Sequence, residues 1–183
     1  SGYKLTRKIV SLLQKIFPDK FRNEKVAVES LCRIYNLSSL ILMGSVGTIA
    51  QNEKSDLDYW LCLNLQEMDR DCIESLKKKL FDIETWAMDS YKLEIHFFIT
   101  DILTVRENKF GEADEESAGS SQAKLLKEEF YRTSVTVAGR FPFWYIVPSG
   151  SNDRLYSQYK KFANSLPDIS QSKLVYLGNL HEI

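Results

Sequence analysis

Two acidic residues in this chain are spaced so that their carboxylates could act together on a metal ion. Asp56 and Asp58 belong to the run DLDYWLCL (56–63), which predicts a strand, so alternation places both side chains on one face. Neighbouring carboxylates on one face repel each other unless a cation lies between them, and Mg²⁺ is the natural candidate. For the pair alone, an exposed strand start, where Asp is common, is the alternative.

A third acid, Glu94, enters the run KLEIHFFIT (92–100), which predicts another strand with Glu94, His96 and Phe98 on one face. An acidic residue in such an apolar strand needs a partner. If this strand pairs with residues 56–63, the three carboxylates can hold two metal ions, a clamp suited to in-line attack on phosphorus. His96 is either a neighbour of this site or a sheet histidine with its hydrogen bonds satisfied.

Gly44 and Ser45 follow the apolar run SLILM (39–43), a predicted buried strand, and precede a predicted helix at 45–51. Glycine permits close approach of the backbone, Ser45 can cap the helix, and the first free N–H groups of a helix bind anions. By itself, a Gly-Ser turn before a helix is more often a plain cap.

The elements that must position these residues follow from periodicity and from Gly and Pro positions. Their order predicts an α+β fold, a small mixed sheet flanked by helices. We expect an N-terminal helical segment (1–37), a core (38–150), and a C-terminal helix and tail (151–183). The predicted helices are 3–17, 24–36, 68–89, 121–138 and 152–165, the further strand is 142–147, and a polar loop covers 106–122.

The composition and charge of the chain exclude several classes of protein. The chain has 183 residues, 24 Lys+Arg against 25 Asp+Glu, and a net charge of −1, which argues against a nucleic-acid or membrane-surface binder. A small polyanionic ligand is not excluded. We expect no membrane span, because no apolar stretch approaches the ~18–20 residues required. Cys32, Cys62 and Cys72 have no metal or redox spacing, so we expect buried free thiols and a cytoplasmic protein. The start at Ser1-Gly2 suggests an excised piece of a longer chain.

The order of strand, Gly-Ser turn, helix, Asp-x-Asp strand and third acid resembles the polymerase-β-like nucleotidyltransferase superfamily. The residues around this pattern are similar to the catalytic core of class I adenylate cyclases of the enterobacterial type. This similarity covers about residues 40–148 and includes MGSVGTIAQ (43–51), SDLDYWLC (55–62), LEIHFFI (93–99), GSSQ (119–122) and EFYRT (129–133). Val46 and Gly47 depart from the small hydroxyl residues usual in that family, which removes candidate phosphate donors.

The resemblance implies conversion of ATP to 3′,5′-cyclic AMP and pyrophosphate, with two Mg²⁺ (or Mn²⁺) ions. Asp56, Asp58 and Glu94 would be catalytic and would bind the metals, Glu94 being also a candidate proton acceptor. The expected nucleotide-binding residues are Gly44, Ser45, Ser120, Ser121, Gln122, Lys124 and Arg132. A regulatory partner would act through parts of the longer chain that are absent.

Several alternatives stay open. Arg132 could instead pair with Glu128 or Glu129 on its own helix, and Lys124 could lie on a solvated face. The chain could be another nucleotidyltransferase, acting on a protein, an antibiotic or an RNA end, or a catalytically silent nucleotide-binding module. Four aromatic residues could stack on the adenine base, but such residues more often belong to the hydrophobic core: Phe141, Phe143, Trp144 and Tyr145.

Overall fold

The computed structural model describes residues 6–16, 18, 37–44, 46, 49–107, 128–165 and 173–178. The chain divides into two compact units, Ser1–Tyr35 and Asn36–Ile183. In the first unit the expected first helix is α1 (Arg7–Ile16), whereas the expected helix at 24–36 lies outside the described residues. Across the described ranges, no helix combines the length and apolarity that crossing a bilayer requires.

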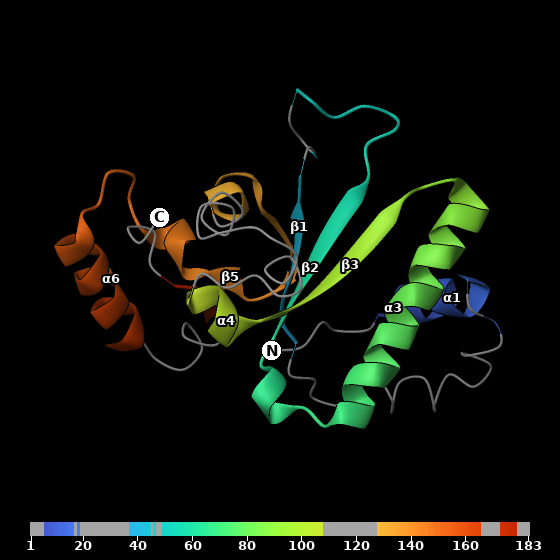
Figure 1. Cartoon of the computed structure of the whole chain (residues 1–183), viewed down its shortest axis with the longest axis horizontal. Coiled ribbons are helices and arrows are strands. Elements are labelled where there is room, and N and C mark those ends of the chain that lie inside the picture. Colours follow the sequence, from blue (N-terminus) through green and yellow to red (C-terminus); the bar gives the residue numbers. More distant parts are fainter. Residues whose placement is uncertain are drawn as a thin grey trace, which may run out of the picture. The chain divides into compact units, whose positions relative to one another are not determined.

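A four-stranded mixed sheet lies at the centre of the second unit (Figure 1). Its strands are β1 (Leu37–Met43), β2 (Leu57–Leu63), β3 (Ile95–Asp101) and β4 (Val135–Gly139), in the order β3-β2-β1-β4. β1 is antiparallel to β2 and β4, and β2 is parallel to β3. The α+β class with a small mixed sheet is therefore confirmed.

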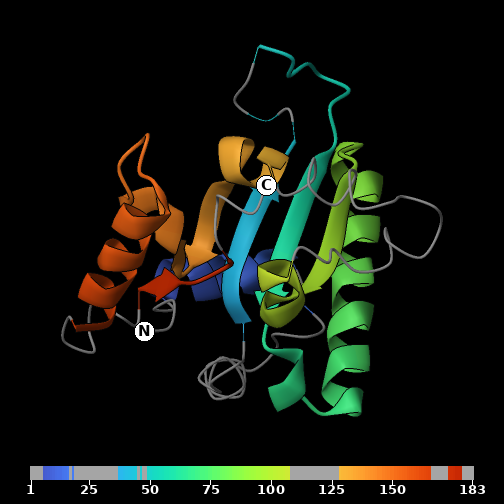
Figure 2. The ribbon, with the colours of Figure 1, turned by 60° about the vertical axis from the view of Figure 1, so that its left-hand side comes forward.

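Helix α3 (Arg70–Tyr91) connects β2 to β3, as a parallel pair requires, and runs beside β3 in both views (Figures 1 and 2). Leu61 and Leu63 of β2 pack with Leu80 of α3 on this face of the sheet. Trp60 and Cys62 belong to a second cluster, on the opposite face. Because residues 60–63 of β2 are buried on both faces, this part of the strand is a continuous apolar run instead of an alternating one.

The other described elements are short, apart from α6. A small parallel sheet joins β5 to β6 beside α6, whose Tyr156 and Ala163 pack with Phe143. The bounds are η1 (Leu65–Glu67), α4 (Ile102–Arg106), β5 (Phe141–Pro142), η3 (Phe143–Ile146), α6 (Asp153–Ser165), β6 (Leu174–Val175), and a helical stretch at 128–133.

Two element predictions are wrong near the C-terminal end of the core. The helix expected at 121–138 ends at residue 133, and β4 follows it. The sequence Val135-Thr136-Val137 is β-branched and pairs with β1, so tertiary pairing overrides the helical pattern. The strand expected at 142–147 is mostly the 3-10 helix η3, since only Phe141 and Pro142 pair with β6.

The thiols differ from the prediction at one position. Cys62 is buried, and burial raises the pKa of its thiol to about 12. Cys72, in the first turn of α3, is exposed, so the expectation that it is buried is wrong. Cys32 lies outside the described residues.

This difference predicts selective labelling. At pH 8, iodoacetamide is expected to alkylate Cys72 on the order of a thousandfold faster than Cys62, because the thiolate is the nucleophile and burial suppresses it. Peptide mapping by mass spectrometry after timed quenching measures each site. Unfolding in guanidinium is the control and should equalise the two rates; equal rates in the native chain would contradict the burial of Cys62.

Candidate functional site

The three predicted acids lie at or just before the starts of β2 and β3. The two strands are in parallel register, with Leu57 opposite Ile95 and Asp58 opposite His96. The Leu57 N–H donates to the Glu94 carbonyl over 3.0 Å, so Asp56 and Glu94 lie beside each other just before the paired residues. The strand pairing on which the three-acid hypothesis depends is therefore observed.

Glu94 precedes β3 because α3 ends two residues later than predicted. The helix continues to Tyr91, and Lys92 ends it in the left-handed conformation, with φ 55° and its N–H donating to the Met88 carbonyl. The strand then begins at Ile95. Glu94 consequently has an exposed side chain at the edge of the sheet, instead of a place within the strand.

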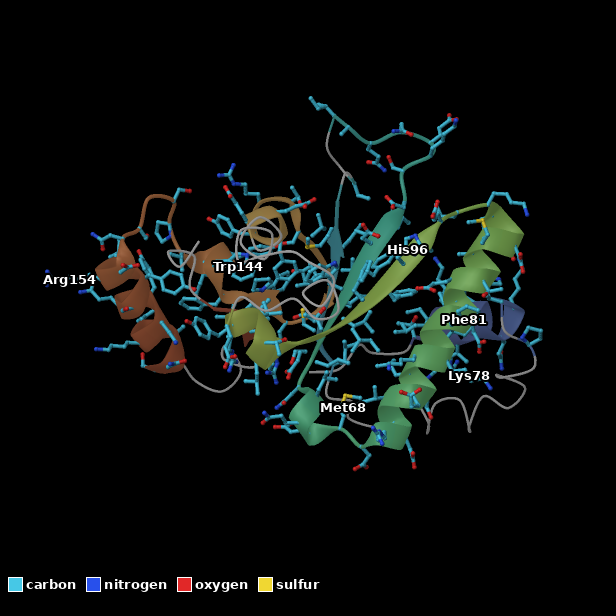
Figure 3. All side chains as sticks on the ribbon, viewed as in Figure 1. Met68, Lys78, Phe81, His96, Trp144 and Arg154 are labelled. Atoms are coloured by element: carbon cyan, nitrogen blue, oxygen red, sulfur yellow. The ribbon has the colours of Figure 1, made fainter. Side chains whose placement is uncertain are left out.

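Asp58 lies on the sheet face opposite α3. Its neighbour on that face, Trp60, is 6.1 Å from Phe98 and 5.3 Å from Phe130 between ring centroids. His96 and Phe98 alternate with Phe97, which stacks on Tyr59 on the α3 side. Asp58 and His96 therefore share one face with an aromatic cluster, and Figure 3 shows His96 on β3 beside β2.

Gly44 lies against the Asp58 carboxylate. Met43, the last residue of β1, is paired with Asp58, and a Cβ at Gly44 would be 3.8 Å from Asp58 Oδ2. Gly44 has φ +89°, a conformation that glycine adopts without strain. The backbone at this turn therefore has open access to the carboxylate edge.

The helix predicted at 45–51 is wrong for the residues that the structure describes there. Val46, Ile49 and Ala50 lie in turns. The loop after them is closed by its own side chains, since the Asn52 N–H donates to Ser55 Oγ and the Lys54 N–H donates to Asn52 Oδ1. Because the residues described after Gly44 form no helix, an anion site at a helix N-terminus has no support here.

Negative charge converges on Asp58. Burial raises the pKa of its carboxyl most, Asp56 raises it next, and Glu129 and Glu94 raise it further, while His96 acts in the opposite direction. Glu129 was missed by sequence reasoning, which treated it only as a partner for Arg132. Its neighbour Phe130 is fully buried against Trp60, which holds the 128–133 stretch over this face.

His96 is hydrogen-bonded to Glu94. His96 Nε2 lies 3.2 Å from Glu94 Oε1, and the two side chains are 45% and 57% exposed. Of the alternatives for His96, the structure supports a place next to the acids. Arg132 forms an exposed ion pair with Glu128, as one of the alternatives expected.

The remaining predicted nucleotide-binding residues cannot be placed, because they lie outside the described residues: Ser45, Ser120, Ser121, Gln122 and Lys124. Among the aromatic residues, Phe143 and Trp144 are core, as expected. Phe141 and Tyr145 are instead 49% and 44% exposed.

The donor set suits a hard divalent cation. Within the described ranges, no three His, Cys, Asp or Glu side chains already converge at metal-binding distance. Mg²⁺, however, is usually bound through one or two carboxylates plus substrate phosphates and water, and not in an all-protein cage. Asp56 and Asp58 provide such a pair, and the negative charge around Asp58 is what a divalent cation would offset.

Comparison with known proteins gives the family. The family model described as "Adenylate cyclase NT domain" matches residues 1–145. The chain belongs to this family. The chain is similar to the adenylate cyclases of Shigella flexneri and Escherichia coli strain K12, and it is 31% identical to each of them over 147 residues. These alignments cover 80% of the chain but 17% of each relative.

The adenylate cyclase of Yersinia pestis is 37% identical over 112 residues, 61% of the chain and 13% of that protein. The chain thus spans only a small fraction of the length of these adenylate cyclases. Among solved structures, a chain from a crystal structure of a toxin-antitoxin with AMP-PNP aligns with 12% identity and a TM-score of 0.32, covering 81% of this chain and 93% of that one. A similarity at this level supports no statement on fold or ligand.

Proposed function

We propose that this chain is the catalytic part of an adenylate cyclase, of polymerase-β-like nucleotidyltransferase fold, that converts ATP to 3′,5′-cyclic AMP and pyrophosphate. One observation carries the proposal: Asp56, Asp58 and Glu94 lie at or just before the paired starts of β2 and β3, beside Gly44, in a member of the adenylate cyclase NT domain family. Relatives that share this region are named adenylate cyclase, which supports ATP as the substrate.

In this reaction the ribose 3′-oxygen attacks the α-phosphorus. The bond from that phosphorus to the oxygen that bridges the α- and β-phosphates breaks, and pyrophosphate leaves. Asp56, Asp58 and Glu94 would hold two Mg²⁺ or Mn²⁺ ions, which when bound acidify the 3′-hydroxyl and offset charge on the leaving group. Glu94, exposed at the strand edge, is a suitable acceptor for the 3′-hydroxyl proton. Gly44, without a side chain, leaves room for phosphate oxygens next to Asp58.

Arg132 would act in this site only after leaving Glu128. The pair is exposed, with side chains 69% and 37% accessible, so it costs little to break. A triphosphate is a stronger partner for a guanidinium than one solvated carboxylate, because Arg binds phosphate through two parallel hydrogen bonds. The Arg132–Glu128 contact is therefore compatible with a role in nucleotide binding. Regulation would come from regions of the longer adenylate cyclases that this chain does not span.

The proposal predicts turnover by the chain itself. Incubation with ATP and Mn²⁺ or Mg²⁺ is expected to yield equimolar cyclic AMP and pyrophosphate, and EDTA should stop the reaction. Liquid chromatography with mass spectrometry detects the nucleotide product and an enzyme-coupled assay detects pyrophosphate.

Either of two other outcomes would contradict the proposal and indicate a different function. Pyrophosphate release with a mass increase on an added acceptor, and no cyclic AMP, would indicate a different nucleotidyltransferase. Stabilisation of the chain by ATP without any product would indicate a silent nucleotide-binding module.

A further inference from the structure

We propose that His96 is a positioning residue that turns the Glu94 carboxylate toward Asp58 and thereby completes the metal-binding set. This inference rests on the proposed function and extends it to a residue outside the three acids. It begins from the 3.2 Å contact between His96 Nε2 and Glu94 Oε1.

His96 is a neighbour of both acids, Asp58 through the strand register and Glu94 through its hydrogen bond. His96 is the direct partner of Asp58 across the parallel pair, and Glu94 precedes His96 by two residues on the same face. Through its bond to His96, the Glu94 side chain is held along β3, in the direction of Asp58. The pKa of Asp58 responds to both neighbours, raised by Glu94 and lowered by His96, which is consistent with this placement.

Glu94 needs such a contact because little else restrains it. Its backbone is fixed by the Leu57 N–H, but it lies just before β3 and its side chain is 57% exposed. A glutamate has several rotatable side-chain bonds, and ordering them for metal binding costs conformational entropy. A partner that already orders the carboxylate lowers this cost.

The contact leaves the carboxylate able to bind a metal ion. His96 engages Oε1, whereas an ionised carboxylate has two oxygens and about four lone-pair sites. Carboxylates that bind metals are commonly hydrogen-bonded by a second residue, and loss of that residue typically costs about 10–100-fold in metal affinity or activity.

The test compares three replacements of His96. His96→Phe keeps the planar bulk but removes the ring nitrogens, His96→Ala removes both, and His96→Gln keeps a side-chain N–H donor. Mn²⁺ binding to the nucleotide-free chain is measured by electron paramagnetic resonance, and cyclase kinetics are measured on the same preparations. We expect His96→Phe and His96→Ala to raise the Kd for Mn²⁺ by about 10–100-fold and to lower kcat with little change in the KM for ATP. His96→Gln should recover most of the loss.

Lys77→Gln is the matched control. It removes another exposed side-chain pair with a 3.2 Å contact, Lys77 with Glu74 on α3, and should leave Mn²⁺ affinity and kcat unchanged. Circular dichroism and Tm should match the wild type in all variants, because each altered side chain is at least partly exposed.

Each remaining outcome has a definite meaning. Normal Mn²⁺ affinity and kcat in His96→Phe, with loss in His96→Gln, would assign His96 to packing and overturn the inference. Tighter Mn²⁺ binding in His96→Phe would show that the bond withholds Glu94 from the metal, and would also overturn it. A wild-type chain that binds no Mn²⁺ and makes no cyclic AMP would overturn the proposed function, and this inference with it.

Discussion

Asp58→Asn is expected to abolish cyclic AMP formation while making the metal-free chain more stable at neutral pH. Metal ions contribute several kcal/mol of transition-state stabilisation, so loss of a central ligand should lower kcat/KM by on the order of 10³-fold or more. Asn keeps the size of the side chain but removes the charge that attracts a cation. Asp56→Asn should also abolish activity; retained turnover in either variant would contradict the metal assignment.

The stability gain follows from the surroundings of Asp58. Burial and the carboxylates of Asp56, Glu129 and Glu94 raise the pKa of Asp58 above its value in the unfolded chain. A raised acid pKa means that the folded state is penalised wherever Asp58 is ionised. The penalty is full above the folded pKa and disappears as pH falls through it toward the ordinary value of about 4.

Asp58 is partly solvated, so the effect is moderate after allowance for solvent screening. In EDTA at pH 7.5 we expect Asp58→Asn to raise Tm by roughly 1–2 °C, and this gain should vanish near pH 4. Added Mn²⁺ should reverse the order, because only the wild-type chain gains stability from binding. Differential scanning fluorimetry at the two pH values, with and without Mn²⁺, measures all of this. A lower Tm for Asp58→Asn in EDTA at neutral pH would show that the site is not electrostatically strained.

Gly139→Ala is expected to be among the most destabilising single changes in the described fold. Gly139 ends β4 with φ +89°, and a Cβ there would collide with the Ser38 carbonyl oxygen and lie 2.9 Å from Ser39 Cα. Both contacts are with backbone, so no side chain can move aside. The Arg140 N–H donates to that same Ser38 oxygen over 2.8 Å, and relief of the clash would break this bond.

Gly150→Ala separates the two sources of cost. Gly150 also has positive φ, at +78°, but a Cβ there meets nothing within 4 Å. Its substitution should cost only the conformational strain, about 1–2 kcal/mol. Gly139→Ala adds the backbone collision and should cost about 3–5 kcal/mol, measured by urea unfolding. Equal losses at the two positions would mean that the β1–β4 contact gives way without cost.

The faces of the site strands could be predicted from the sequence, because alternation depends only on local geometry. Alternation within residues 56–63 predicts that Asp56 and Asp58 share a face, and alternation within 92–100 predicts the same for Glu94 and His96. The long intervening helix is what a parallel pairing of the two strands requires. The predicted ends of the helices and strands were less accurate. The end of α3, for example, depends on the left-handed conformation of Lys92, which no sequence pattern predicts.

The elements that failed depend on distant partners. β4 was predicted as the end of a helix that Gly139 would cap; only pairing with β1 makes it a strand. Glu129 could not be assigned to the site because its place depends on the packing of Phe130 against Trp60, a contact between residues remote in the chain. The helix predicted at 45–51 is also wrong, since Val46, Ile49 and Ala50 lie in turns.

The sheet order has a consequence for how the chain folds. β1, β2, α3 and β3 follow one another in sequence, whereas β4 reaches β1 across a gap of 101 residues, measured between the bonded Ser39 and Arg140. Closing that gap costs more chain entropy than forming the hairpin of β1 and β2. The strands β2 and β3, which carry Asp58 and His96, can therefore assemble before β4 joins. Gly139→Ala should accordingly act late, speeding unfolding more than it slows folding.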